Sequence, residues 1–233
     1  MAATFQHYPY LTAEEFAETC HYLDKRYCQA ALGQTRQQWR LDLHTALDTS
    51  ATSYADLVTF VQITRPLDND AVENHLASRL SNVGLEADVN MMETEETDKE
   101  VLPRHTSSRT RFPSSHVIYE IHLHPTYRVP CLWFSLRNLP LDESPLDIET
   151  VFRRLVPEQY KQILRGQGAM GSVSIEHHPI TGLPTFFVHP CLLGDAMAPF
   201  DCSKEDYLLV WLGLVGACVG LFAPKELAIL DRP

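Results

Sequence analysis

The feature that most restricts the fold is a long apolar hairpin in the middle of the chain. Apolar residues alternate with other residues from Val117 to Leu123, which is the pattern of a strand with one buried face. A turn follows at Pro125, and the chain returns through Val129–Leu136, which is apolar on both faces. A strand of that kind lies beside a core. The pattern therefore predicts a β-hairpin that packs against the rest of a folded domain.

The other predicted elements fit helices packed against an antiparallel sheet. Thr12 and Glu15 form a capping box at a helix start, and strands are expected at 39–43 and 57–64. Further helices are expected at 70–83, 147–155, 158–164 and 205–221, with a small hairpin formed by residues 173–176 and 186–188. The order predicts an α+β fold with an antiparallel sheet of about four strands, packed by helices, plus the small hairpin.

Length and charge favour one globular domain without nucleic-acid binding. The chain has 233 residues, enough for a single domain with a sizeable core, and its net charge is −11. A negative charge of that size argues against a nucleic-acid partner. Residues 86–115 combine an acidic half with a Ser/Thr/Arg/Pro half, and few of them could offset the cost of ordering. We expect a flexible insertion there, within one domain that spans residues 1–233.

Cysteine usage and hydropathy favour a cytoplasmic protein. The six cysteines have no regular spacing and no C-x-x-C pair, which predicts reduced thiols and no zinc site. The first residues lack the basic and apolar stretches of a signal peptide. The uncharged run 207–222 is 16 residues long, below the ~20 that span a bilayer, so we expect a buried segment there and no membrane anchor.

The stretch Pro184–Cys191 places a cysteine at the end of a short strand. Phe186, Phe187 and Val188 form an apolar run, and Pro190 cannot donate a hydrogen bond to a sheet. The strand therefore stops before Cys191, where the backbone is fixed but a side chain can still face solvent. On these residues alone an inert buried thiol is favoured over a nucleophile.

Four blocks in order resemble one known family. The signature is the segment from Glu176 to Cys191, with Pro-Ile-Thr-Gly-Leu-Pro followed by Phe-Phe-Val-His-Pro-Cys. Residues 127–134, 144–147 and 211–221 also match, so the resemblance runs from about residue 117 to 224. Together they resemble the autophagy-related protein ten family, whose members are ubiquitin-like-conjugating enzymes of autophagy. This resemblance implies the fold of ubiquitin-conjugating enzymes, in agreement with the α+β pattern.

The resemblance implies an acyltransferase that works through a cysteine thioester. It maps the nucleophile onto Cys191, because thiolate is both a good nucleophile and a good leaving group. It also implies three partners: autophagy-related protein twelve as the transferred ubiquitin-like protein, autophagy-related protein seven as the activating enzyme that donates it, and a lysine of autophagy-related protein five as the acceptor. No cofactor is implied for this step.

Transfer to a lysine needs a group that supports the developing oxyanion. Ordinary ubiquitin-conjugating enzymes carry a His-Pro-Asn motif a few residues before the cysteine, and here the cysteine stands where that asparagine would be. The candidate supporting residues are Tyr119, His178 and His189. Each also has a structural alternative: Tyr119 as a core strand residue, His178 as part of a turn, and His189 as a group that hydrogen-bonds the backbone of the cysteine loop.

Tyr127 and Arg128 are candidates for partner binding. They lie in the turn of the 116–136 hairpin, and Tyr and Arg are enriched at binding hot spots. We expect this turn to dock the acceptor protein; the alternative is that Tyr127 covers the sheet end while Arg128 is solvated.

Two other functions remain open from the sequence. One is a non-catalytic binding module of the same fold. The other is a papain-like cysteine hydrolase, which we disfavour because such folds start a helix at the cysteine, whereas no periodic apolar run begins here before Tyr207.

Overall fold

The computed structural model describes residues 5–47, 57–67, 115–165 and 173–229. The helix expected at 70–83 and the insertion expected at 86–115 lie outside these residues, apart from Ser115. Ser115 is buried, and its hydroxyl donates to the carbonyl oxygen of Asn138 (2.8 Å). Ser115, one residue before His116, therefore belongs to the packed domain.

A long N-terminal helix packs against one face of the sheet. Helix α1 (Ala13–Gln29) begins at the expected capping box, in which the Thr12 side chain accepts from the Glu15 amide and the Glu15 carboxylate accepts from the Thr12 amide. Its buried face includes Phe16, Cys20, Leu23 and Tyr27. A single turn, α2 (Thr35–Gln38), leads into the sheet.

The sheet has six antiparallel strands, in the order β1-β2-β3-β4-β6-β5. The strands are β1 (Arg40–Leu47), β2 (Leu57–Pro66), β3 (His116–Leu123), β4 (Pro130–Arg137), β5 (Val173–His177) and β6 (Pro184–Val188). The four expected strands are all present. The expected small hairpin is present as β5 and β6, and β6 also pairs with β4, so the sheet in the described residues has six strands where about four were expected.

The register sends two neighbouring rows of residues to opposite faces. One row across the strands consists of buried apolar side chains, which form the core beneath the helices: Leu41, Ile63, Tyr119, Phe134 and Phe186. The next row consists of mostly polar or aromatic side chains on the opposite face, which we call the outer face: Asp42, Gln62, Glu120, Trp133 and Phe187. The same sheet therefore builds the core on one side and a polar network on the other.

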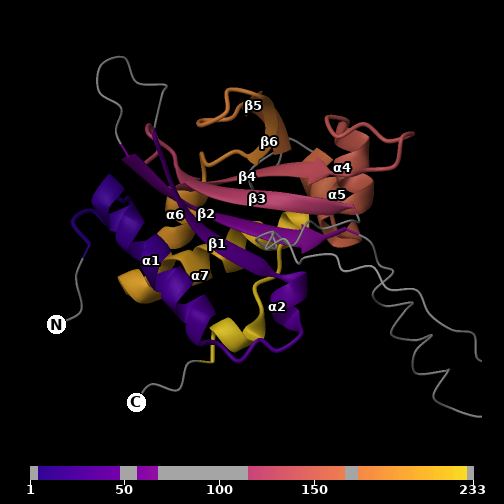
Figure 1. The fold of residues 1–233 in the computed structure, drawn as a ribbon. Coiled ribbons are helices and arrows are strands. Elements are labelled where there is room, and N and C mark those ends of the chain that lie inside the picture. The colour runs from indigo at the N-terminus through magenta and orange to yellow at the C-terminus, as the bar shows by residue number, and fades with distance from the viewer. Residues whose placement is uncertain (1–4, 48–56, 68–114, 166–172, 230–233) are drawn as a thin grey trace, which may run out of the picture. The chain divides into compact units, whose positions relative to one another are not determined.

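The C-terminal half completes the core. Helices α4 (Ile148–Arg154) and α5 (Glu158–Arg165) precede the β5–β6 hairpin, and α6 (Leu193–Met197) with the 3₁₀ turn η1 (Ala198–Phe200) follows it. Helix α7 (Lys204–Val215) contacts α1, as Figure 1 shows, and continues into η2 (Gly216–Val219). A last turn, η3 (Lys225–Leu227), ends the described chain.

The uncharged run expected to be buried is helix α7 with η2. Tyr207 and Trp211 are fully buried, and the Tyr207 hydroxyl donates to the Pro9 carbonyl oxygen (2.6 Å). Among the described residues no helix is both long and apolar enough to cross a bilayer.

Candidate active site

Cys191 lies just past the end of β6 with its side chain exposed. Strand β6 ends at Val188, and Pro190 cannot donate to a sheet partner, so the chain leaves the sheet at the His-Pro step. Pro190 is buried while Cys191 is exposed. The thiol therefore stands at the rim of the sheet on a backbone that is anchored immediately before it.

His189 connects the cysteine to the sheet. Its Nδ1 accepts a hydrogen bond from the Cys191 backbone amide (3.2 Å). Its ring lies edge-on to Tyr127, with 5.6 Å between the ring centroids, and 5.9 Å from the ring of Phe187. Three of the residues singled out from the sequence, Cys191, His189 and Tyr127, are thus brought together at one point.

The turn between β3 and β4 borders this point. Tyr127 is 37% exposed and packs on His124, with ring centroids 4.8 Å apart. Arg128 has a positive φ of 51°, and its guanidinium Nε donates to the Leu11 carbonyl oxygen (3.2 Å). Arg128 is exposed, but this contact ties it to the start of α1, so it also has a structural role.

Tyr119 does not reach the cysteine. It belongs to the buried row beneath the helices and is 0% exposed. Its hydroxyl donates its one proton to the Val219 carbonyl oxygen (2.7 Å), and burial raises its pKa. The expectation that Tyr119 supports the oxyanion is therefore not retained, because its only donor is already used in the core.

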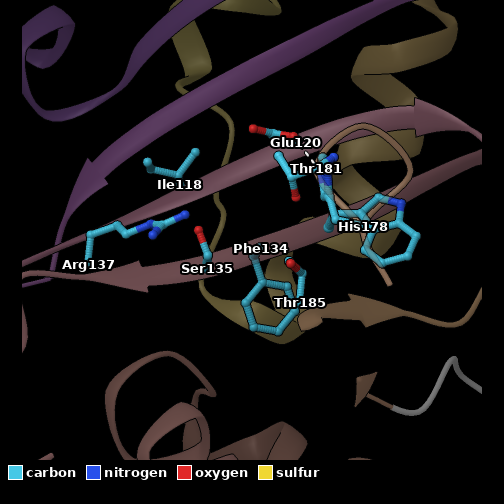
Figure 2. A pocket seen from close by; sticks show the side chains of 9 residues that line it. Ile118, Glu120, Phe134, Ser135, Arg137, His178, Thr181 and Thr185 are labelled. Atoms are coloured by element: carbon cyan, nitrogen blue, oxygen red, sulfur yellow. Dashed lines mark hydrogen bonds and ion pairs between the residues drawn. The ribbon is translucent and has the colours of Figure 1, made fainter. Parts of the chain in front are cut away.

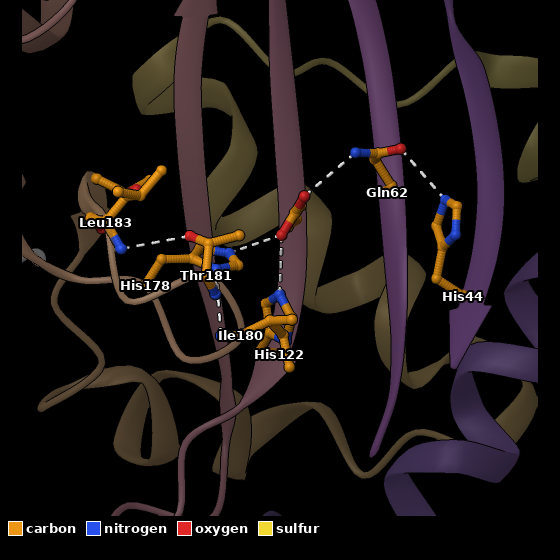
Figure 3. A network of polar contacts seen from close by, with 9 residues as sticks. His44, Gln62, His122, His178, Ile180, Thr181 and Leu183 are labelled. Carbon is orange, nitrogen blue, oxygen red and sulfur yellow. Dashed lines mark hydrogen bonds and ion pairs between the residues drawn. The ribbon is translucent and has the colours of Figure 1, made fainter. Parts of the chain in front are cut away.

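His178 belongs to a polar network on the outer face (Figure 3). Its Nε2 lies 2.6 Å from Glu120 Oε2, and its Nδ1 accepts from the amides of Ile180 and Thr181, each at 3.3 Å. An Nδ1 that accepts leaves the ring proton on Nε2, which donates to Glu120. The expectation that His178 supports the oxyanion is not retained either, because both ring nitrogens are committed to holding the β5–β6 turn against the sheet.

Glu120 gathers the other members of the network. Its carboxylate accepts from Gln62 Nε2 (3.1 Å) and lies 3.1 Å from His122 Nε2, while Gln62 Oε1 lies 3.2 Å from His44. Burial by itself would raise the pKa of Glu120, but the hydrogen bonds from His122 and His178 outweigh it and hold this pKa well below its usual range. Burial lowers the pKa of His122. The network therefore favours an ionised Glu120 facing a neutral His122.

Glu120, His122 and His178 could also be read as metal ligands, since their ligand atoms lie within 4.8 Å of one another. The hydrogen bonds at His178 argue against that use. A neutral imidazole that binds a metal through Nε2 carries its proton on Nδ1, and here Nδ1 faces two backbone N–H groups. The donor arrangement fits a hydrogen-bonded anchor and does not fit a metal site.

A shallow pocket adjoins this anchor on the outer face. It is lined by Ser135, Arg137, Thr181 and Thr185 as well as by Glu120 and His178, and its volume is ≈ 40 Å³ (Figure 2). That volume suits water and is far below the size of a small-molecule site. The chemistry of the candidate site therefore rests on Cys191 and its surroundings.

The six cysteines all lie in the described part of the chain, and none is paired in a disulfide. Cys20 and Cys131 are buried, and burial raises the pKa of both thiols. Cys202 and Cys218 are half-buried, and burial raises their pKa values too. Only Cys28 and Cys191 are exposed, and Cys28 lies near the end of α1, away from any strand end.

The helix argument used against a papain-like hydrolase was wrong. Helix α6 begins at Leu193, two residues after Cys191. The sequence concealed it because Leu-Gly-Asp-Ala-Met is only five residues long and the residue before it, Leu192 at the N-cap, offers no side-chain cap. A different observation argues against the hydrolase: the one histidine that contacts this cysteine, among the described residues, bonds its backbone amide and not its thiol.

The sequence reasoning missed Glu120, His122 and His124. Their roles depend on strand register and on turn geometry, which single-residue patterns do not reveal. One signal was present, however. Every His-Pro step in the sequence (at 124, 178 and 189) falls where a strand ends.

Comparison with known proteins agrees with the geometry. Residues 15–226 match the family described as autophagocytosis associated protein, active-site domain. Two relatives are each named ubiquitin-like-conjugating enzyme ATG10. The one from Gibberella zeae is 50% identical over 97% of this chain and 99% of its own length. The one from Homo sapiens is 33% identical over 56% of this chain and 59% of its own length. The chain therefore belongs to the autophagocytosis-associated active-site-domain family, within its ATG10 group of ubiquitin-like-conjugating enzymes.

Proposed function

We propose that Cys191 carries a ubiquitin-like protein as a thioester and passes it to a lysine. In the first step the Cys191 thiolate attacks the carbonyl carbon of the thioester on the activating enzyme, whose own thiolate leaves. In the second step the lysine amine attacks the new thioester, loses a proton, and the Cys191 thiolate leaves. The observation that carries this proposal is the exposed thiol at the end of β6, on a backbone anchored by His189.

The partners follow from the family. We propose autophagy-related protein twelve as the ubiquitin-like protein, autophagy-related protein seven as the activating enzyme and autophagy-related protein five as the acceptor. A relative named ubiquitin-like-conjugating enzyme ATG10 that matches over nearly its whole length supports this choice. ATP is consumed by the activating enzyme, so this chain needs no cofactor for its own step. Six unpaired cysteines suit a reducing compartment, and we propose the cytoplasm.

We further propose that the acceptor docks on the β3–β4 turn. Tyr127 contacts the ring of His189, which bonds the Cys191 amide, so a protein bound at this turn lies close to the thioester. Pro125 and Arg128 also border a groove of ≈ 660 Å³ between the first turn of α1 and the start of β2. A recess beside an exposed aromatic ring is a favourable place for a partner's side chains.

A reconstituted assay tests the carrier step. The protein is mixed with activating enzyme, ATP and the ubiquitin-like protein, and the products are separated with and without thiol reductant. We expect an adduct that reductant removes. Single substitutions to alanine at Cys28, Cys202 and Cys218 serve as matched controls and should leave the adduct at its wild-type level, whereas an adduct lost with one of them would move the nucleophile away from Cys191.

Tyr127→Ala tests the docking step. Arg128 is left unchanged, because its bond to Leu11 would confuse docking with stability. We expect normal charging, normal discharge to free hydroxylamine and slow transfer to the acceptor protein. Equal slowing with hydroxylamine and with the acceptor would show that Tyr127 acts on the cysteine and not on docking.

A further inference from the structure

The three His-Pro steps of this chain share one hydrogen-bonding geometry. In each, Nδ1 of the histidine accepts from the backbone amide two residues later. For His124 the donors are Thr126 (3.2 Å) and Tyr127 (3.3 Å); for His178 they are Ile180 and Thr181 (3.3 Å each); for His189 the donor is Cys191 (3.2 Å). The imidazole here does what an Asn or Asp side chain does in an Asx turn.

Proline explains why the amide two residues later is the one that is bound. It carries no N–H, and its ring fixes φ, so the first available donor after the histidine belongs to the next residue. The histidine before proline is held in an extended conformation, which directs its side chain along the turn. The motif is therefore a local device for fixing one backbone amide.

The His-Pro steps at 124 and 178 differ from the one at 189 in the backbone amide that each holds. His124 and His178 cap the turns of the β3–β4 and β5–β6 hairpins, and the amides they bind belong to residues of those turns. His189 follows the last residue of β6, and no strand follows it among the residues described up to 229. The amide that it binds is that of Cys191, the exposed thiol.

Two aromatic rings border the ring of His189. Tyr127 stands edge-on to it and Phe187, two residues earlier in the chain, lies tilted to it, at centroid distances of 5.6 and 5.9 Å. The ring is half-buried. Because Nδ1 accepts, a neutral His189 carries its proton on Nε2, and Nε2 has no partner among the described residues. Within the described ranges, Nδ1 is thus the only nitrogen of this ring that makes a hydrogen bond.

We propose that His189 is a positioning residue that aims the Cys191 thiol through its Nδ1. The bond fixes the backbone of the nucleophile, and the direction of the side chain follows from the backbone. Attack on a thioester needs a defined approach, and a shift of about 1 Å in a reacting group can slow a reaction by about 100-fold. The inference rests on the proposed function, since it assigns a role in the thioester steps of Cys191.

Two variants of similar shape distinguish the role of Nδ1 from that of Nε2. In His189→Asn the amide oxygen can take the place of Nδ1, whereas His189→Gln places its amide group nearer to Nε2. We expect His189→Asn to transfer to hydroxylamine within about threefold of wild type, and both His189→Gln and His189→Ala to be slowed by at least about tenfold. His177→Gln, an exposed histidine outside the site, is the control and should match wild type.

A readout other than activity tests the bond itself. Hydrogen exchange of the Cys191 amide should stay slow in wild type and in His189→Asn, and become fast in His189→Gln and His189→Ala. Urea midpoints within error of wild type confirm that the variants remain folded.

The opposite order of transfer rates, with His189→Gln near wild type and His189→Asn slow, would overturn the proposal, because it would assign the role to Nε2. Equal rates in all three His189 variants would overturn it as well. Absence of any adduct on wild-type Cys191 is a distinct result, because it contradicts the proposed function before His189 is tested.

Discussion

Cys131 and Cys191 are both placed by the end of β6 and have opposite properties. Cys131, on β4, is fully buried, and its thiol donates to the carbonyl oxygen of Val188 at the end of β6 (3.4 Å). Cys191 follows Val188 by three residues and is exposed. One thiol is a small apolar side chain with a raised pKa; the other is free to react.

The same contrast holds for the other side chains that the sequence singled out. Tyr119 and His178 have donors that the fold already uses, on Val219 and on Glu120. His189 bonds the Cys191 amide through Nδ1, and its Nε2 has no partner in the part of the chain that the structure describes. The difference teaches that reactivity in this domain follows from where β6 ends. Tyr119 and His178 instead stabilise the fold through their bonds to Val219 and Glu120.

Alkylation should give the largest difference between the two thiols. We expect iodoacetamide to modify Cys191 and exposed Cys28 in the native protein at least ~1,000-fold faster than Cys131 and Cys20, because the buried thiols need both local opening and deprotonation. Peptide mass spectrometry after timed quenching measures the four rates. Similar rates for Cys131 and Cys191 would remove the basis of the comparison.

Replacing Glu120, the residue that joins His122 and His178, should give the second-largest effect. Glu120→Ala leaves the buried His178 and His122 without their acceptor, and we expect it to lower the free energy of unfolding by about 2–3 kcal/mol. Urea denaturation measures this loss. Glu120→Gln keeps an acceptor oxygen and should lose less. Unchanged stability in the alanine variant would show that the β5–β6 turn is held by other contacts.

Acidification should weaken the same network. The pKa of His122 is lowered in the fold by burial, so the unfolded chain takes up a proton first and stability falls as the pH drops below about 6.5. The pKa of Glu120 is also lowered, so its contribution is present above about pH 4.3 and is lost below it. Urea midpoints across this range should fall with pH, and His122→Gln should flatten the upper part of the curve.

Tyr119→Phe should have a smaller effect, confined to stability. It removes the bond to the buried Val219 carbonyl, at a cost of about 1–2 kcal/mol, and leaves charging and transfer unchanged in the folded protein. Denaturation midpoints and single-turnover transfer rates measure the two properties separately. A transfer defect at unchanged stability would return Tyr119 to the list of groups that act on the reaction.

Local patterns predicted most of the elements, because each depends on neighbours in the sequence. Three local patterns predicted their elements correctly: the capping box at Thr12 a helix start, the alternation from Val117 to Leu123 a strand, and the His-Pro step before Cys191 a strand end. The pairing of β4 with β6 and the contact of Glu120 with His178 join residues more than 50 positions apart, and no local pattern determines them. The exposure of Cys191 is a local consequence of Pro190, whereas the loss of Tyr119 and His178 as candidates depends on distant partners.

The central claim is that Cys191 forms the covalent bond to the ubiquitin-like protein, and replacement of its sulfur tests this most directly. Charging reactions with wild type, Cys191→Ser and Cys191→Ala are compared by intact mass before and after thiol reductant. We predict a reductant-sensitive adduct in wild type, a reductant-resistant oxyester in the serine variant because alkoxide is a poorer leaving group than thiolate, and no adduct in the alanine variant. An adduct that persists at the wild-type level in Cys191→Ala would contradict the account.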